Sequence, residues 1–268
     1  MDLSYMKIYD NQAYCAFCGK ILIPIGLNYL CENYDREFLN YKRCECEMAV
    51  DYWNKKDSTN EQMKKRKSQI ELMKKCNLQG IKTRFQECSF EDYQLRDVEN
   101  CNIEKIKKYL NETDSLRLII QGDTNTGKTY LAACIANEST KNGQIVVMNR
   151  LNLLFEKIKE TYTNNGVSED EMMDLYSNVD LLIIDDFGME RLTQWALDKF
   201  YTILSNRIEN NLSTIITTKF KMSDLINRLN YSCDYEMVNA IVSKLKMNFY
   251  GISLDKKEKV STSRETKC

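Results

Sequence analysis

The chain has 268 residues, of which 43% are hydrophobic and 29% charged, a balance typical of a globular protein with one large domain or a small and a medium one. The formal net charge of −1 excludes an overall basic field that would draw the protein to nucleic acid, so any DNA contact requires a local patch. No apolar run approaches the ~20 residues of a membrane span and the N-terminus has no apolar signal segment, so we expect a cytoplasmic protein with no membrane contact.

Residues 1–50 are rich in cysteine and contain two close pairs that 25 residues separate. The pairs are Cys15 with Cys18 and Cys44 with Cys46. This spacing suits a tetrahedral Zn²⁺ held by four thiolates, and the absence of histidine from the chain excludes imidazole ligands and histidine-based catalytic triads. Cys31 is a fifth candidate ligand, and buried reduced thiols are the alternative interpretation. We predict a small zinc-binding domain over residues 1–50.

A polar, highly charged segment begins at residue 51, and we assign residues 51–95 to a helical linker. Within it, Lys55–Lys75 has an apolar stripe at helical spacing through Met63, Ile70 and Met73. Its many lysines allow a basic helix that contacts DNA phosphates. We favour a solvated linker helix, because acidic residues interrupt the basic run.

From residue 116 onward, short apolar runs alternate with amphipathic stretches. The predicted strands are 118–121, 145–148, 181–185, 214–218 and 249–254. The predicted helices are 128–139, 151–163, 193–211, 222–229 and 236–247. Unbroken apolar strands are typical of a parallel sheet that helices cover on both faces. The alternation therefore predicts an α/β nucleotide-binding domain.

A glycine loop joins the first of these strands to the first of these helices. It fits the pattern G-x-x-x-x-G-K-[ST] at every fixed position and consists of Gly122, Asp123, Thr124, Asn125, Thr126, Gly127, Lys128 and Thr129. Its glycines allow backbone N–H groups to surround a phosphate, and the helix N-terminus adds positive potential. We expect Lys128 to reach the β- and γ-phosphates of ATP and the Thr129 hydroxyl to ligate Mg²⁺.

An acidic pair, Asp185 and Asp186, ends the apolar run 181–184 about 50 residues after the glycine loop. The strand brings Asp185 to the sheet edge that carries the phosphates, where its carboxylate can hold Mg²⁺ through water. Asp186 is then positioned to act as the general base for the attacking water. The alternative is that both aspartates are solvated turn residues.

Together these residues resemble the bacterial and phage replicative helicase loaders of the DnaC/DnaI type, a branch of the AAA+ ATPases. The likeness runs through the cysteine pairs and through residues 80–85, 89–93, 127–132, 182–188, 193–195 and 213–218. Tyr130 stands where the family usually has histidine, and we count it among the nucleotide-binding residues.

The resemblance implies a zinc-bearing domain over residues 1–50 that binds the hexameric replicative DNA helicase. It implies an AAA+ P-loop domain over residues 96–268, with a parallel sheet flanked by helices, that binds ATP, Mg²⁺ and single-stranded DNA. ATP then acts as a switch between holding the helicase and releasing it onto DNA at the initiation of replication. Self-association stays open at this point.

Three positions depart from the family pattern. Lys219 follows Thr218 where asparagine is usual, and Lys244 stands where an arginine finger is expected, although lysine lacks the planar bidentate contact. Asp255 occupies the usual place of a sensor arginine. These changes predict intact ATP binding with slow hydrolysis, and Arg207 and Arg228 are the neighbouring arginines that could substitute.

Two alternatives to a helicase loader remain. A transposition helper ATPase of the IstB type has a similar AAA+ core, and that family is not expected to carry the cysteine cluster. A nucleotide-switched adaptor with little hydrolysis fits the missing asparagine and arginine. The zinc content of the protein distinguishes a helicase loader from the transposition helper. The rate of ATP turnover distinguishes a loader from the adaptor.

Overall fold

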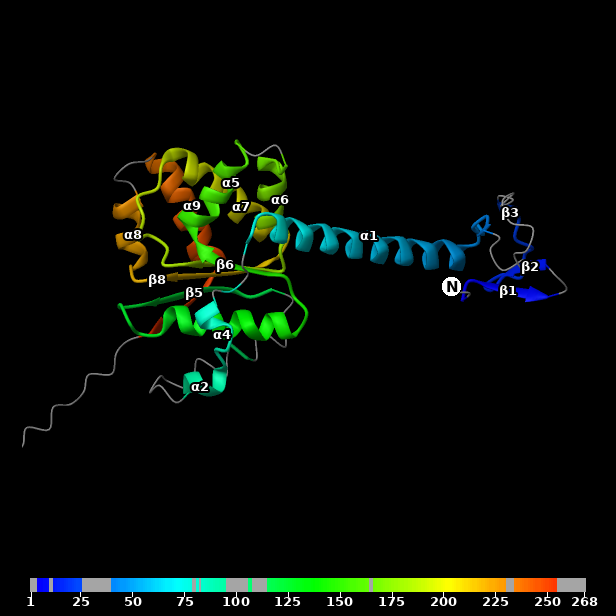
Figure 1. The fold of residues 1–268 in the computed structure, drawn as a ribbon, viewed down its shortest axis with the longest axis horizontal. Coiled ribbons are helices and arrows are strands. Elements are labelled where there is room, and N and C mark those ends of the chain that lie inside the picture. Colours follow the sequence, from blue (N-terminus) through cyan, green and yellow to red (C-terminus); the bar gives the residue numbers. More distant parts are fainter. Residues whose placement is uncertain are drawn as a thin grey trace, which may run out of the picture. The chain divides into compact units, whose positions relative to one another are not determined.

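The computed structural model describes the chain in two compact units, Met1–Ser68 and Gln69–Cys268 (Figure 1). The residues that it describes are 4–9, 12–25, 40–78, 81, 83–94, 106–107, 115–163, 166–229 and 234–254. Helix α1 (Glu47–Lys75) gives its first turns to one unit and its last turns to the other. It begins eight residues before the predicted Lys55, because Ala49 is already buried in the core of the first unit.

The first unit is built from short antiparallel strands. Strand β1 (Met6–Tyr9) pairs with β2 (Gln12–Cys15), and β3 (Pro24–Ile25) pairs with β4 (Asn40–Tyr41). Among the described residues of this unit, the buried hydrophobic ones are Ala13, Cys15, Leu22 and Ala49. Small domains with few buried side chains are commonly stabilised by a metal ion or a disulfide, and the cysteine pairs of this unit are candidates for such a site.

The second unit contains the predicted parallel sheet. Its strands are β5 (Arg117–Gly122), β6 (Val146–Arg150), β7 (Leu181–Asp185), β8 (Ser213–Thr218) and β9 (Tyr250–Leu254). They pair in the order β6-β7-β8-β5-β9, and every pairing is parallel. The predicted α/β class is confirmed, and each predicted strand ends within two residues of the observed one.

Helices cover both faces of this sheet (Figure 1). One face lies under α4 (Lys128–Lys141), η2 (Thr83–Phe85) and α2 (Phe90–Gln94). The other lies under α5 (Leu151–Glu160), α6 (Glu169–Asn178), α7 (Gln194–Glu209), α8 (Met222–Leu229) and α9 (Tyr235–Asn248). Alternate residues of a strand enter opposite cores: Leu118 and Ile120 face α4, whereas Ile119 faces the five helices. This double burial explains the unbroken apolar runs.

Helix α6 was not predicted from the sequence. Its start carries a capping box: the Ser168 side chain accepts from the backbone N–H of Glu171, and the Glu171 carboxylate accepts from the backbone N–H of Ser168. The signal S-x-x-E was therefore present in the sequence. The five predicted helices are observed at their expected places.

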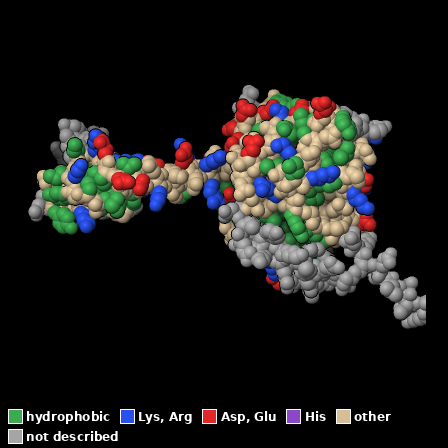
Figure 2. Space-filling view, turned by 180° about the vertical axis from the view of Figure 1, so that it is seen from behind, with side chains coloured by type: hydrophobic (Ala, Val, Ile, Leu, Met, Phe, Trp, Pro, Cys, Tyr) green, Lys and Arg blue, Asp and Glu red, His purple; other side chains and the backbone are tan. Residues whose placement is uncertain are grey.

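Two observations concern membrane-spanning helices and the distribution of charge over the described residues. Among the described residues, no helix has the length and apolarity that a bilayer crossing demands. Figure 2 shows lysine and arginine side chains intermixed with aspartate and glutamate on the visible face of the second unit. Charges of both signs therefore share this face, in keeping with the formal net charge of −1 for the whole chain.

Candidate nucleotide site and cysteine cluster

The glycine loop lies between β5 and α4, at the carboxyl edge of the sheet. Both of its glycines are required by the packing. A Cβ on Gly122 would overlap the carbonyl oxygen of Leu254, and a Cβ on Gly127 would lie 3.2 Å from the ring of Tyr93. Gly127 also has φ 92°, which favours glycine. The loop therefore has a backbone that larger residues at these two positions would disturb.

The first turn of α4 is open to an anion. Its N-cap residue, Gly127, offers no side-chain hydrogen bond, so the first backbone N–H groups of the helix are left for a ligand. Lys128 is only 6% exposed, and its ammonium donates to the carbonyl of Asp123 over 2.6 Å. Burial lowers the pKa of Lys128, while Asp186, Asp185 and Asp123 act in the opposite direction. The predicted phosphate-binding groups thus converge on one loop.

The Asp185 carboxylate joins three segments of the site. Its Oδ1 accepts from the Thr129 hydroxyl over 2.8 Å and from the Thr217 hydroxyl over 2.7 Å. Thr129 belongs to α4, Asp185 ends β7, and Thr217 lies in β8. Since hydroxyl and carboxylate oxygens are ligands that Mg²⁺ prefers, Thr129 and Asp185 form a donor set that fits this ion.

Asp186 lies beside this donor set in a strained backbone conformation. Its φ of 56° falls in the left-handed region, which turns the chain sharply after β7. Its backbone N–H donates to the Thr217 hydroxyl over 2.9 Å. Its carboxylate accepts from the Arg150 guanidinium at the end of β6 over 3.0 Å. Asp186 is therefore held at the sheet edge by both neighbouring strands.

Three residues of this neighbourhood were absent from the expected site: Thr217, Arg150 and Tyr93. Thr217 lies in the apolar strand preceding Lys219, and only the parallel pairing reveals that it reaches Asp185. The ring of Tyr93 stacks on that of Tyr130 with centroids 5.8 Å apart and planes 20° apart. Tyr93 belongs to segment 89–93, which forms part of the family resemblance. That resemblance assigned no role to Tyr93.

The segment before β5 packs on α4. The Asn137 side chain donates to the carbonyls of Phe85 and Cys88, each over 2.8 Å, and the Cys134 thiol donates to the Ser89 carbonyl over 3.0 Å. Phe90 and Tyr93 are buried in the same core as α4. The described residues 83–94 consequently belong to the second unit, and they pack against the helix that follows the glycine loop.

The three positions that depart from the family pattern, Lys219, Lys244 and Asp255, lie in different parts of the chain. Lys219 directly follows β8 and is exposed. Lys244 is on α9, with its ammonium 5.2 Å from the centre of the Tyr201 ring. Asp255 and the two following lysines lie outside the described residues, as does Cys31.

The two neighbouring arginines differ in their burial, and Arg207 is not available as an arginine finger. Arg207 is fully buried, and its guanidinium donates to the Thr214 hydroxyl and to the carbonyls of Tyr176, Val179 and Ser213. Arg228 donates to the carbonyls of Gly188 and Met189 within its own chain.

The four paired cysteines converge in the first unit. The sulfur atoms of Cys15, Cys18, Cys44 and Cys46 all lie within 4.8 Å of one another. The Cys15–Cys46 and Cys18–Cys44 sulfur distances are 3.8 and 3.5 Å. A tetrahedral ion with metal–sulfur bonds of ~2.3 Å requires sulfurs about 3.8 Å apart. The donor set therefore fits Zn²⁺.

The thiols of the cluster differ in pKa. The backbone N–H of Cys46 hydrogen-bonds to the Cys44 sulfur and lowers the pKa of Cys44 to about 7. Burial raises the pKa of Cys46 to about 12. A metal ion that binds Cys46 would therefore have to displace its proton, because the metal binds the thiolate.

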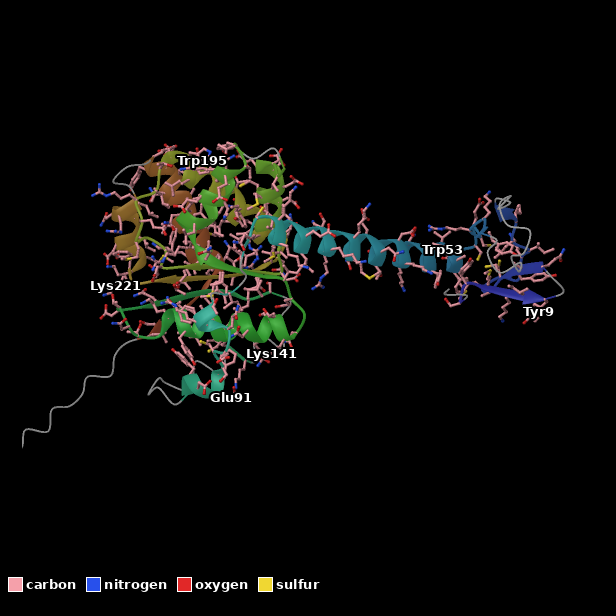
Figure 3. All side chains as sticks on the ribbon, in the orientation of Figure 1. Tyr9, Trp53, Glu91, Lys141, Trp195 and Lys221 are labelled. Atoms are coloured by element: carbon pink, nitrogen blue, oxygen red, sulfur yellow. The ribbon has the colours of Figure 1, made fainter. Side chains whose placement is uncertain are left out.

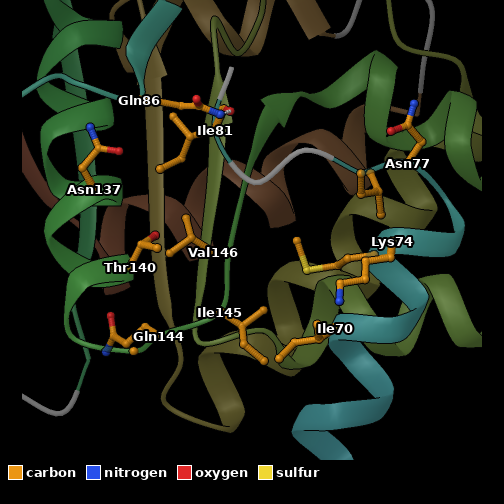
Figure 4. Close-up of a pocket in the computed structure, with 13 residues that line it drawn as sticks. Ile70, Lys74, Asn77, Ile81, Gln86, Asn137, Thr140, Gln144, Ile145 and Val146 are labelled. Atoms are coloured by element: carbon orange, nitrogen blue, oxygen red, sulfur yellow. Dashed lines mark hydrogen bonds between the residues drawn. The ribbon is translucent and has the colours of Figure 1, made fainter. Parts of the chain in front are cut away.

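A separate groove of about 880 Å³ lies at the opposite edge of the sheet from the glycine loop (Figure 4). It is bounded by the end of α1, by the end of α4 and by the residues that lead into β6, including Lys74, Thr140 and Ile145. Since parallel strands carry the phosphate loop at their carboxyl ends, this groove is not part of the nucleotide site.

Comparison with known proteins identifies a matching family and a similar relative. A family model described as IstB-like ATP binding protein matches residues 46–256. The replicative helicase loader DnaC of Escherichia coli K12 is 29% identical over 163 residues, which cover 60% of this chain and 66% of that protein. The chain thus spans just under two thirds of this relative's length.

Two solved structures share the fold. The crystal structure of DnaI superimposes with a TM-score of 0.55 at 28% identity, covering 65% of this chain and 94% of that one. The crystal structure of the DnaC helicase loader superimposes with a TM-score of 0.51 at 22% identity, covering 65% of this chain and 99% of that one. The second likeness speaks to the fold alone.

Proposed function

The chain belongs to the IstB-like ATP-binding protein family, and from this premise we propose that it is a helicase-loading ATPase of the DnaC/DnaI type. In this proposal it binds the hexameric replicative DNA helicase and delivers it to single-stranded DNA, with ATP as the switch. The observation that carries the proposal is the pairing of two separate sites in one chain. One is the loop Gly122–Thr129 with Asp185, and the other is the four-sulfur cluster on the first unit.

The nucleotide part rests on residues with complementary roles. The open N-terminus of α4 and Lys128 hold the phosphates, and Thr129 and Asp185 hold Mg²⁺. When bound by these residues, Mg²⁺ would neutralise negative charge on the phosphates. Tyr130, which follows the loop in α4, stacks on Tyr93, whose ring lies against Gly127.

Hydrolysis is assigned to Asp186. Its carboxylate takes a proton from a water molecule as the water oxygen bonds to the γ-phosphorus, and the β–γ bridging oxygen leaves with ADP. The ion pair with Arg150 holds this carboxylate back from the water. We therefore propose that turnover is slow, as Lys219 and Lys244 in place of asparagine and arginine also suggest.

The partner surface is assigned to the first unit. We propose residues 1–50 as the zinc-bearing domain that binds the helicase, 51–95 as the linker and 96–268 as the ATPase domain, with the end of the linker, residues 83–94, packed into the core of the ATPase domain. Tyr9 (labelled in Figure 3), Ile21 and Ile23 are 60%, 59% and 64% exposed. Apolar side chains left in water in this way favour a protein partner.

A transposition helper ATPase is the second candidate, because the matching family model carries the IstB description. That match begins at residue 46, so it leaves out Cys15, Cys18 and Cys44. The cluster geometry therefore favours the loader. The pure adaptor is the third candidate, and it requires that no ATP is turned over in the presence of helicase and single-stranded DNA.

Co-purification tests the proposal. The full chain is immobilised at low salt, and the replicative helicase of the source organism is passed over it with and without ATP. We expect the hexamer to be retained and its release to depend on nucleotide and single-stranded DNA. Absence of retained helicase under both conditions contradicts the loader assignment. The Cys18→Ala variant, which breaks the thiol cluster, serves as the matched control and is expected to lose the helicase.

A further inference from the structure

Glu190 uses one of its two carboxylate oxygens for a hydrogen bond within the described chain. It stands four residues after Asp186, at the end of the turn that follows β7. Its Oε2 accepts from the backbone N–H of Asn152 over 2.8 Å. Its Oε1 is buried and has no hydrogen-bond partner among the residues that the structure describes. A buried carboxylate oxygen without a donor is unfavourable, so its presence requires an explanation.

The turn that carries Glu190 has a fixed backbone. The backbone N–H of Met189 donates to the Asp186 carbonyl over 3.2 Å. The Arg228 guanidinium donates to the carbonyls of Gly188 and Met189. Gly188 has φ 85°, a conformation that glycine adopts without strain. From this fixed turn the Glu190 side chain reaches the first turn of α5.

Arg150 lies at the same end of α5. It is the N-cap residue of this helix and precedes Asn152, the hydrogen-bond partner of Glu190, by two positions. Burial raises the pKa of Glu190, and the hydrogen bond from the Asn152 N–H opposes this rise. The charge of Arg150 also lowers that pKa, whereas the charge of Asp186 raises it. Arg150 therefore interacts with two carboxylates, and in this structure its hydrogen bond goes to Asp186.

The Arg150 guanidinium thus has a second acceptor available. It carries five N–H donors in a planar fork, so it can pair with either carboxylate. Its present pair with Asp186 reaches solvent and is weak enough to exchange. In an ATP complex the attacking water donates to Asp186, and the guanidinium then needs another acceptor. The unpartnered Oε1 of Glu190 supplies one.

We propose that Glu190 is a positioning residue for hydrolysis, whose Oε1 accepts from the Arg150 guanidinium when Asp186 turns to the attacking water. The inference rests on the ATP hydrolysis of the proposed function. Glu190 acts through Arg150 and does not itself touch the nucleotide. Because Arg150 stays paired in both states, the Asp186 carboxylate is released more easily. Without the second acceptor, Arg150 remains on Asp186 for a larger share of the time and hydrolysis slows.

Steady-state phosphate release by the full chain with Mg²⁺ and varied ATP tests this role. Glu190→Gln removes the charge of the second acceptor and keeps an oxygen for the Asn152 N–H. It is expected to lower kcat roughly threefold to fivefold, the range of a partly exposed ion pair, while KM and the melting temperature stay unchanged. In an Arg150→Ala background the same substitution should have no effect, because the residue through which Glu190 acts is gone.

Glu156→Gln is the matched control for the loss of a carboxylate. Glu156 is an exposed residue of α5 whose charge also acts on Glu190. Its substitution is expected to leave kcat and KM unchanged, because its carboxylate is not the proposed acceptor of Arg150. An equal fall of kcat in Glu156→Gln and Glu190→Gln would overturn the assignment, since any nearby negative charge would then serve.

Two further kinetic results overturn the role of Glu190. An unchanged or raised kcat in Glu190→Gln would leave Glu190 as a cap of α5 alone. A similar fall in the Arg150→Ala background would show that Glu190 acts without Arg150.

A crystal structure of the wild-type chain with Mg²⁺ and AMP-PNP decides the same point without turnover. A guanidinium of Arg150 on Glu190 supports the exchange, and one that is still on Asp186 contradicts it. A wild-type chain that binds AMP-PNP and releases no phosphate from ATP contradicts the ATPase of the proposed function. The position of Arg150 in the AMP-PNP complex then still shows whether Glu190 is its second acceptor.

Discussion

The guanidinium of Arg150 holds the carboxylate of Asp186 across the edge of the sheet, with 3.0 Å between Nη2 and Oδ2. The two residues come from the ends of β6 and β7, which are paired in parallel. The Arg150 side chain is 49% exposed and that of Asp186 30%, so solvent weakens the pair to at most about 1 kcal/mol. A pair this weak can open when a ligand binds, and its opening releases the carboxylate.

Arg150→Ala is therefore expected to raise the basal ATPase rate severalfold with little effect on the melting temperature. The reason is that Asp186 loses its partner and becomes available to the attacking water. Steady-state phosphate release measures the change.

Two variants control this prediction. Arg150→Lys is expected to preserve a low rate, and Asp186→Asn is expected to abolish turnover while AMP-PNP still binds. A fall in rate in Arg150→Ala contradicts the restraining role and assigns Arg150 to the phosphates instead.

Lys128→Ala is expected to weaken ATP binding by about a hundredfold, because it removes a buried cation whose hydrogen bonds to phosphate are charge-assisted. Fluorescence titration with a labelled ATP analogue measures the loss. The metal content of the variant should equal that of wild type, since the cysteine cluster lies in the other unit. Wild-type affinity in this variant would mean that the phosphates lie elsewhere.

Metal analysis of the purified chain is expected to find one zinc per molecule. Chelation or acidification below about pH 5 should release it, because each of the four thiolates must take back a proton. The indole of Trp53 packs against the cysteine unit, so its fluorescence in a Trp195→Phe background reports the loss of structure. Nucleotide affinity should be unaffected. Purified chain without metal but with a folded first unit would sink the zinc assignment.

Arg207→Met is expected to destabilise the second unit by ~3 kcal/mol or more. The substitution leaves one hydroxyl and three carbonyl acceptors in the interior without their donor. Urea unfolding followed by Trp195 fluorescence, in a Trp53→Phe background, measures the change. Lys246→Met removes an exposed cation from α9 and should change stability by less than ~0.5 kcal/mol. Equal stability of the two variants would show that Arg207 has no structural role.

The parallel sheet could be predicted because its strands are buried on both faces. The run Leu181–Ile184 has no polar interruption, and the turn residues around it mark its ends. The glycine loop was recognisable because phosphate binding restricts the backbone at Gly122 and Gly127. In both cases the structural requirement restricts consecutive residues, so the pattern can be recognised in a short stretch of sequence.

The remainder of the site depends on contacts between distant residues. Arg150 and Thr217 reach the acidic pair only because β6 and β8 flank β7, an order that the sequence does not state. The strands of the first unit were missed because two- to four-residue strands carry almost no periodicity. Arg207 looked like a candidate finger until its burial showed that its donors are used inside the chain.

The hydrogen bonds of Asn137 also set a limit on how the chain can be shortened. A fragment that starts at residue 96 would lack the carbonyls of Phe85 and Cys88 and would leave the space of Phe90 and Tyr93 empty beneath the glycine loop. Its soluble yield and nucleotide affinity would suffer for reasons unrelated to catalysis. The smallest fragment suited to crystallisation or screening of the ATPase part therefore begins near Gln69, where the compact unit itself begins.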